Sequence, residues 1–246
     1  MAVLQIICPG QIRSEVLKNG RDYGCRGCPS FTSFAGQPPT HEKEPDFEIR
    51  SVLKGSFTRP GASEVLAEFS GCEPHASNFG GTLLLEKSGQ KWRRVRYAGG
   101  LVGLVRTYAQ ADGHDIVLDQ GGYTGQGTST GWISVYDFSS KPDPSEHTLL
   151  RLEDTSGNAC QLDRVALAYI EKLEFPDLDG DGKPDLRVTV RWGQAKVPVR
   201  FRGKCEEDFK PPSPPAYTID FVFDGKSLRV VPGSAATLRK VAARDE

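Results

Sequence analysis

Residues 177–186 read DLDGDGKPDL and bring four aspartates together in one short stretch. Counted from the first aspartate, they occupy positions 1, 3, 5 and 9, with a glycine at position 6. Side-chain oxygens at positions 1, 3 and 5 can converge on one hard cation, the glycine permits a sharp turn, and position 7 offers its backbone carbonyl. Carboxylates this close repel each other, and a divalent cation relieves the repulsion. The predicted calcium ligands are Asp177, Asp179, Asp181, the backbone carbonyl of Lys183, and Asp185.

This loop is not an EF-hand. Position 12 is Val188, where an EF-hand needs a bidentate glutamate, and position 8 is Pro184. The following LRVTVRW alternates like a strand, whereas helices flank an EF-hand loop. Magnesium is disfavoured because it prefers octahedral sites that keep several waters. The nearest histidine is His147, 30 residues before Asp177, so we expect the ion to be structural and not catalytic.

The segment FPDLDGDGKPDLRV resembles the FG-GAP repeat of integrin α-chains and the related VCBS repeats of bacterial secreted proteins. Those repeats form β-propeller blades that carry an Asp-x-Asp-x-Asp-Gly-x-x-Asp calcium loop between two strands. The resemblance is close over residues 175–190. It implies calcium binding by the four aspartate side chains and by the carbonyl of Lys183.

Two weaker copies of this pattern occur earlier in the chain. Glycine-containing acidic turns begin at Arg59 and Gln110, and each leads into an apolar strand. Glu64 and Asp115 then stand where Asp185 stands in the third copy, at separations of 51 and 70 residues. Such spacing is typical of sheets of about four strands. The first two copies lack the paired aspartates, so we expect them to bind no ion.

The fold class is predicted to be all-β. The chain has 27 Gly, 17 Pro and a single Met, and strong helical patterns are few. Short alternating segments such as 47–53 and 91–97 predict strands, and Ser88-Gly89 predicts the turn of a hairpin over 82–97. We expect propeller-like blades or repeated antiparallel sheets, with a β-sandwich as the alternative. Three copies are fewer than the roughly four blades of a closed propeller.

A boundary is predicted near residue 46, dividing a cysteine-containing N-terminal arm (1–46) from a repeat-containing β domain (47–246). In the arm, a short helix is expected over 12–18, ended by Asn19-Gly20. Residues 159–175 fit a helix or a strand, and we favour a strand over their second half. The proline-rich 210–217 predicts an extended loop.

Six cysteines in a chain poor in methionine favour disulfides and an oxidising compartment. Six cysteines allow 15 pairings, of which we expect Cys160 with Cys205 and the other four among themselves. The alternative is a zinc-stabilised protein, because CRGC and CEPH have zinc-knuckle spacings. That zinc set would be Cys25, Cys28, Cys72 and His75.

Charge and hydropathy restrict the partners and the compartment. The formal net charge is −1 without a basic stripe, so nucleic acid is not expected. The longest apolar runs are far below the ~20 residues that span a bilayer, so no membrane span is expected. The first ten residues contain no secretory signal. We expect a secreted or periplasmic protein whose signal peptide has been removed.

The predicted role is binding or adhesion, with a protein or carbohydrate surface as ligand. A homo-oligomer is left open. The rival is a secreted hydrolase or carbohydrate-active enzyme on the same scaffold, although no catalytic residues are predicted. GTSTG at 127–131 matches the G-x-S-x-G pattern around a nucleophilic serine, here Ser129. It lies in a glycine-rich segment followed by a strand, whereas a nucleophile elbow joins a strand to a helix, so we interpret it as a surface loop.

Overall fold

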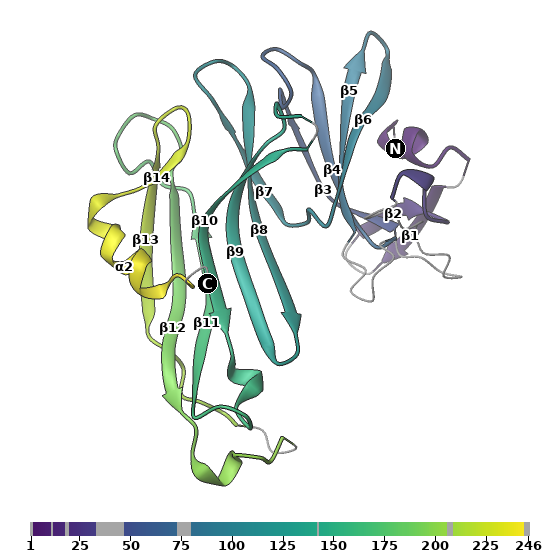
Figure 1. The fold of residues 1–246 in the computed structure, drawn as a ribbon. Coiled ribbons are helices and arrows are strands. Elements are labelled where there is room, and N and C mark those ends of the chain that lie inside the picture. The colour runs from purple at the N-terminus through teal and green to yellow at the C-terminus, as the bar shows by residue number, and fades with distance from the viewer. Residues whose placement is uncertain are drawn as a thin grey trace. The chain divides into compact units, whose positions relative to one another are not determined.

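The computed structural model describes residues 2–10, 12–17, 20–32, 47–72, 80–141, 143–205 and 209–243. This part is mostly β, with fourteen strands in three antiparallel sheets (Figure 1). The all-β prediction is therefore confirmed, and the propeller arrangement stays a prediction. No helix in these ranges has the length and apolarity needed to cross a membrane.

The chain forms two compact units. The first comprises Met1–Gln120 and Val135–His147, and the second comprises Gly121–Ser134 and Thr148–Glu246. The boundary is predicted after residue 46, and residues 33–46 on its N-terminal side lie outside the described ranges. Backbone pairing of Cys25 with Phe47 joins the end of the predicted arm to the strand that follows it.

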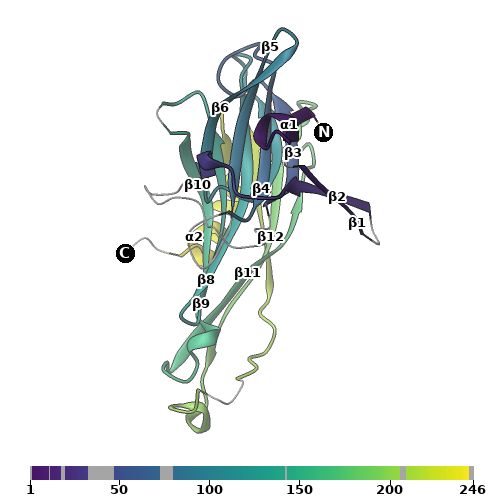
Figure 2. The same cartoon turned by 90° about the vertical axis from the view of Figure 1, so that its right-hand side faces the viewer.

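The first sheet has the strand order β1-β2-β3-β4-β5-β6. Its strands are β1 (Ile12–Leu17), β2 (Gly20–Cys25), β3 (Phe47–Gly55), β4 (Glu64–Ser70), β5 (Gly81–Ser88) and β6 (Lys91–Gly99). The first six residues of β4 and of β5 are all buried, so both faces of these strands are covered. Leu4 and Ile7 of helix α1 (Ala2–Ile7) pack beside Phe69 and Leu83 on one face (Figure 2). Phe57 and Phe138 belong to the core on the other.

The helix predicted over residues 12–18 is wrong, because Ile12–Leu17 forms strand β1. This strand pairs with β2 in antiparallel register from Ile12 opposite Cys25 to Leu17 opposite Gly20. A neighbouring strand that supplies backbone partners outweighs the weak local preference for helix.

The second sheet has the order β10-β9-β8-β7. Its strands are β7 (Leu104–Ala109), β8 (Asp115–Gly125), β9 (Thr128–Asp137) and β10 (Ser145–Asp154). The prediction of a surface loop around GTSTG is wrong, because this segment forms the end of β8, the start of β9 and the turn between them. Gln126 and Gly127 in the turn have positive φ. Trp132 lies against Gly121, where a Cβ would meet the indole, so the glycine makes room for the ring.

The third sheet has the order β11-β12-β13-β14. Its strands are β11 (Arg164–Glu174), β12 (Leu186–Lys196), β13 (Ala216–Phe223) and β14 (Leu228–Val230), and helix α2 (Ala235–Val241) contacts β13. The preference for a strand over the second half of 159–175 is confirmed by β11. Residues 210–215 form the expected irregular segment. The remaining helices are short 3-10 turns at Ser30–Thr32, Ser156–Asn158, Val199–Phe201 and Pro232–Ser234.

The predicted repeats recur at one topological position. Strands β3 to β6, β7 to β10 and β11 to β14 each form four consecutive antiparallel strands. The acidic turns at 59, 110 and 179 each connect the first and second strands of one set. The prediction of sheets of about four strands is confirmed for the second and third copies, whereas the first copy lies in a six-stranded sheet that also contains β1 and β2.

Three disulfides join all six cysteines: Cys8–Cys25, Cys28–Cys72 and Cys160–Cys205. The predicted pair and the pairing of the other four among themselves are confirmed. Cys25, Cys28 and Cys72 of the alternative zinc site are all in disulfides, so they supply no thiolate for a metal. His75 lies outside the described ranges. Disulfides persist in oxidising compartments, so the structure indicates an extracellular or periplasmic type of environment.

Candidate metal centre

The acidic loop connects β11 to β12 in the third sheet. Its two ends are closed by a hydrogen bond from the backbone N–H of Asp185 to the carbonyl of Pro176 (2.8 Å). Gly180 and Gly182 have φ angles of 81° and 80°. Other residues rarely adopt this left-handed conformation, so the two glycines allow the chain to turn tightly around the carboxylates.

Three of the predicted ligands lie together. Asp177, Asp179 and Asp185 each offer a carboxylate oxygen, and these oxygens all lie within 4.8 Å of one another. Calcium binds oxygen at 2.3–2.6 Å, so ligands on opposite sides of one ion are about 4.6–5.2 Å apart. The three oxygens therefore fit around a single calcium ion.

Backbone N–H groups hold the exposed carboxylates in place. Asp177 accepts hydrogen bonds from Gly180 (2.8 Å) and Gly182 (3.0 Å), one on each oxygen. Asp179 accepts one from the backbone of Asp181 (3.1 Å). Each carboxylate oxygen has a second lone pair, so these bonds orient the side chains and leave capacity for a cation.

Asp181 points to a different partner. Its carboxylate accepts hydrogen bonds from the backbone N–H of Lys183 (2.8 Å) and from the Lys183 ammonium (3.0 Å). The backbone bond first, and then the ammonium, hold the pKa of Asp181 below its usual value. Lys183 thus carries the one positive charge within a loop of four aspartates. The roles of Asp181 and of the Lys183 carbonyl as ligands stay predictions.

Asp185 differs from the other aspartates because its side chain is completely buried. Its Oδ2 accepts from the backbone N–H of Leu178 (2.7 Å), at the start of the loop. Its Oδ1 accepts from the backbone N–H of Phe223 (2.7 Å), at the end of β13. Asp185 therefore fixes the loop to the sheet and presents a carboxylate next to Asp177 and Asp179.

The acidic residue of the first copy has the same structural role. Glu64 is buried, and its Oε2 accepts from the backbone N–H groups of Phe57 (2.6 Å) and Thr58 (2.8 Å). In the second copy, Asp115 accepts from the backbone N–H of Ser56 (2.7 Å). The sequence pattern places these acids at equivalent positions, but their role as acceptors for backbone N–H groups was not predicted from it. The signal that could have indicated this role is their position, since Glu64 and Asp115 are the first residues of strands that are apolar from the second residue on.

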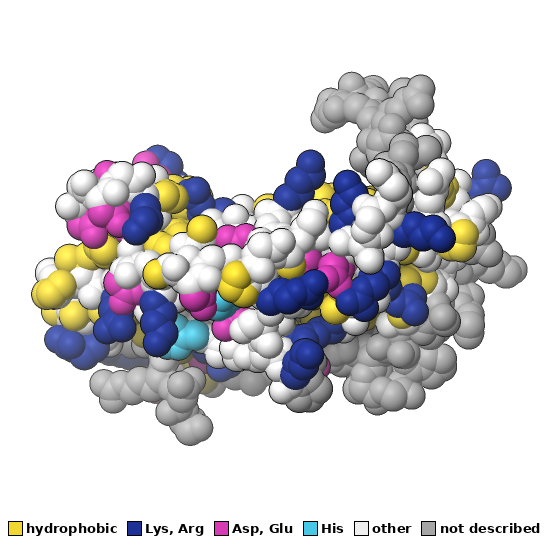
Figure 3. Space-filling model, turned by 90° about the horizontal axis from the view of Figure 1, so that it is seen from above, with side chains coloured by type: hydrophobic (Ala, Val, Ile, Leu, Met, Phe, Trp, Pro, Cys, Tyr) yellow, Lys and Arg dark blue, Asp and Glu magenta, His cyan; other side chains and the backbone are white. Residues whose placement is uncertain are grey.

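Other residues considered for chemistry are placed differently. Ser129 pairs its hydroxyl with Thr124 (2.9 Å) across the β8–β9 hairpin. His114 is buried with Nδ1 at 2.7 Å from Asp112 and Nε2 at 3.5 Å from Asp137. Among the described residues no hydrogen bond joins Ser129 to a histidine, and His41 and His75 lie outside them. On the face seen in Figure 3, acidic side chains lie among basic ones, in keeping with the small net charge.

Searches with this chain find no matching family model, no matching curated protein and no matching solved structure.

Proposed function

We propose that this chain is a secreted or periplasmic β-repeat protein that binds one structural calcium ion in residues 177–185 and acts as an interaction module. The observation that carries the ion is the cluster of Asp177, Asp179 and Asp185, whose oxygens are close enough for one ion. The cluster lies between the first and second of four consecutive antiparallel strands. FG-GAP and VCBS repeats carry their calcium loop between two strands of a blade, which supports the same assignment here.

The ion would offset the charge of a loop that has four aspartates and one lysine. Asp177, Asp179 and Asp185 would supply the first oxygens. Asp181 would add a further ligand by exchanging its contact with the Lys183 ammonium for the ion. Because Asp185 also accepts from Phe223, an ion at this site would couple the loop to the end of β13. Its function would be to hold the turn between β11 and β12.

The compartment and the interaction role have separate support. Three disulfides favour an oxidising location, where free calcium is high enough for the weaker sites typical of extracellular modules, with Kd values of about 10⁻⁴–10⁻³ M. The role in binding or adhesion is supported by the resemblance to FG-GAP and VCBS repeats.

Calorimetry of the purified chain tests the ion. We expect excess calcium to raise the melting temperature relative to a chelator, since a ligand at 100 times its Kd stabilises the folded state by about 2.7 kcal/mol. The D177N/D179N double variant should lose this difference, and D143N, which changes an exposed aspartate outside the loop, should keep it. Equal melting of the wild-type chain in calcium and in chelator would contradict the proposal.

A further inference from the structure

The end of the β8–β9 hairpin belongs to a part of the second unit that carries no charge. Residues 120–134 contain no Asp, Glu, Lys or Arg, and neither do residues 155–162, although 26% of the chain is charged. The two segments lie side by side, because the amide of Asn158 donates to the hydroxyl of Thr128 (3.0 Å). The polar side chains of both segments are hydroxyls and amides. This surface therefore has hydrogen-bonding capacity without charge.

One face of the hairpin is turned toward β11 (Figure 1). Gly131 marks this face, because a Cβ on that residue would lie 3.9 Å from Cδ1 of Ile170 in β11. Side chains alternate between the two faces of a strand, so Thr130 and Trp132 on either side of Gly131 point away from β11.

Tyr123 lies on the same face as Trp132. Thr124 and Ser129 pair their hydroxyls across the hairpin (2.9 Å), so both lie on the face of Gly131, and the neighbouring Tyr123 lies on the other. The face directed away from β11 is here called the aromatic face. Its residues are Gly121, Tyr123, Gly125, Thr128, Thr130 and Trp132.

The side chain of Tyr123 lies along its strand. A Cβ added at Gly125, two residues further on, would overlap the Tyr123 hydroxyl and lie 2.7 Å from two atoms of its ring. The ring therefore extends over the place that this glycine leaves empty. The residue is 50% exposed. A ring that lies along the backbone and is half exposed turns one of its broad sides to solvent.

Trp132 lies over a second glycine of the same strand. A Cβ added at Gly121 would overlap the indole at Cε2, Nε1 and Cζ2, and the residue is partly exposed. Gly121 and Gly125 are four residues apart, which corresponds to about 13 Å along a strand. The aromatic face thus carries two rings at two separate positions.

These features fit the chemistry of an uncharged sugar chain. A pyranose ring has C–H groups on its broad sides and hydroxyl groups around its rim. The C–H groups can pack on the negative face of an aromatic ring. The hydroxyls can bond to neutral groups such as those of Thr128, Thr130 and Asn158. Without charge the surface gives a charged ligand no electrostatic advantage. Two separated rings suit an oligosaccharide better than a single sugar.

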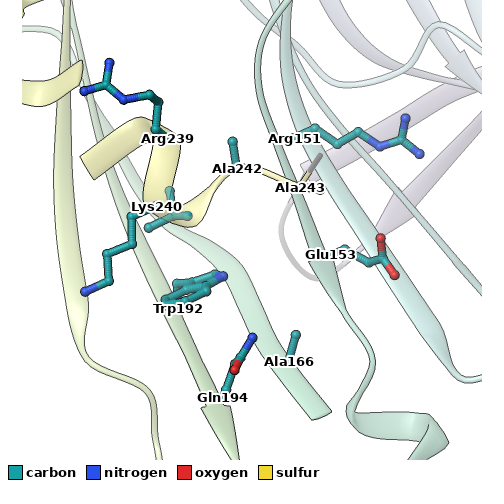
Figure 4. Close-up of a pocket in the computed structure, with 10 residues that line it drawn as sticks. Arg151, Glu153, Ala166, Trp192, Gln194, Arg239, Lys240, Ala242 and Ala243 are labelled. Atoms are coloured by element: carbon teal, nitrogen blue, oxygen red, sulfur yellow. The ribbon is translucent and has the colours of Figure 1, made fainter. Parts of the chain in front are cut away.

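A groove elsewhere in the same unit has a different character. It has a volume of about 770 Å³ and contains one aromatic ring among its described lining residues, that of Trp192 (Figure 4). Its lining also includes the charged residues Arg151, Glu153, Arg239 and Lys240. Trp192 therefore serves as a control for a second aromatic position in the same unit.

We propose that the aromatic face of the β8–β9 hairpin binds an uncharged polysaccharide in extended form, with one sugar ring on Tyr123 and another on Trp132. This inference rests on the proposed role of the chain as an interaction module and names the class of its ligand. It does not require the calcium ion, since no residue of the aromatic face belongs to residues 177–185.

Isothermal titration calorimetry with defined oligosaccharides tests this site. The probes are the uncharged cellohexaose, mannohexaose and chitohexaose, the disaccharide of whichever binds most tightly, and the charged hexamer of galacturonic acid. We expect at least one uncharged hexamer to bind with a Kd below about 1 mM. Its disaccharide and the charged hexamer should bind at least tenfold more weakly.

Variants of Tyr123 and its neighbour test the position of the sugar. Y123A should weaken binding of the best hexamer at least tenfold, whereas Y123F, which keeps the ring, should not. G125V keeps Tyr123 but fills the place of its ring, so it should also weaken binding. The matched control is Y169A, since Tyr169 of β11 is 48% exposed and lies outside the hairpin. Its affinity should equal that of the wild type.

Three results would overturn the proposal. They are no binding of any uncharged hexamer at about 1 mM, equal affinities of Y123A and the wild type, and tighter binding of the galacturonic acid hexamer. Loss of binding in W192A but not in Y123A would assign the sugar to the groove instead. The D177N/D179N variant should bind the hexamer as the wild type does. A failure of the calcium site is thereby distinguished from a failure of the aromatic face.

Discussion

Phe223 donates its backbone N–H to Oδ1 of Asp185 at 2.7 Å, across 38 residues of sequence. This bond joins the end of β13 to the acidic loop before β12, and Oδ2 of the same carboxylate holds Leu178 at the loop's start. One buried side chain thus connects the loop to β13, the strand that pairs with β12, and is itself a candidate ion ligand. Its loss should affect folding even when calcium is absent.

Replacing Asp185 tests this anchoring role. We expect D185A to lower the free energy of unfolding by about 3 kcal/mol in the presence of chelator, because the buried N–H of Phe223 and the partly buried N–H of Leu178 lose a charged acceptor. Urea unfolding followed by tryptophan fluorescence measures the change. The exposed control D143A should stay within about 0.5 kcal/mol of the wild type. Similar stabilities for D185A and D143A would refute the anchoring role.

Glu64 gives the matching test in the first unit. E64A should also destabilise the chain by about 3 kcal/mol, because the N–H groups of Phe57 and Thr58 lose their acceptor. Unlike variants of Asp177 and Asp179, it should leave the calcium-dependent change in melting temperature intact. Differential scanning calorimetry in calcium and in chelator measures both effects. A loss of the calcium effect in E64A would contradict the separation of the two roles.

Glu86 should make part of the stability depend on acidity. Its carboxylate is hydrogen-bonded by Arg59 and also by Arg93, and the bond to Arg59 is the main cause of its lowered pKa. A carboxyl pKa that is lower in the folded state stabilises the fold above the ordinary glutamate pKa, and this contribution disappears as the pH falls through the folded value. E86Q should therefore lose less stability than the wild type between pH 5 and pH 3, about the range in which glutamate titrates.

Denaturant melts at a series of pH values measure this dependence. The matched control is E153Q, which changes an exposed glutamate that has no ion pair among the described residues. Its pH dependence should follow that of the wild type. If E86Q also follows the wild type through the acid range, the ion pairs of Glu86 do not contribute in this way.

The disulfide between Cys160 and Cys205 should stabilise the second unit. It links residues 45 apart and therefore restricts a long segment of the unfolded chain. We expect the C160A/C205A variant to be about 2–4 kcal/mol less stable than the wild type. Chemical denaturation without reductant measures the difference. In the presence of a strong reductant, after full reduction of all disulfides, the variant and the wild type should be nearly equal, and a persistent difference would show that packing around the two sulfurs is responsible.

The sequence alone determined the features that depend on neighbouring residues. Period-two alternation located β3 and β6, Ser88-Gly89 marked the hairpin turn, and the spacing of the aspartates defined the loop. The repeat of an acidic turn before a strand correctly predicted the four-stranded sheets of the second and third copies. These features could be predicted because turn chemistry and side-chain alternation act over a few residues.

Only the tertiary structure decided the features that depend on distant partners. Ile12–Leu17 is a strand because β2 pairs with it, although its local sequence also fits a helix. Asp181 pairs with Lys183 while its three neighbours cluster, and Asp185 is buried because Phe223 approaches it. Burial, register and the direction of a carboxylate depend on residues far away in sequence, and these are fixed only when the chain has folded.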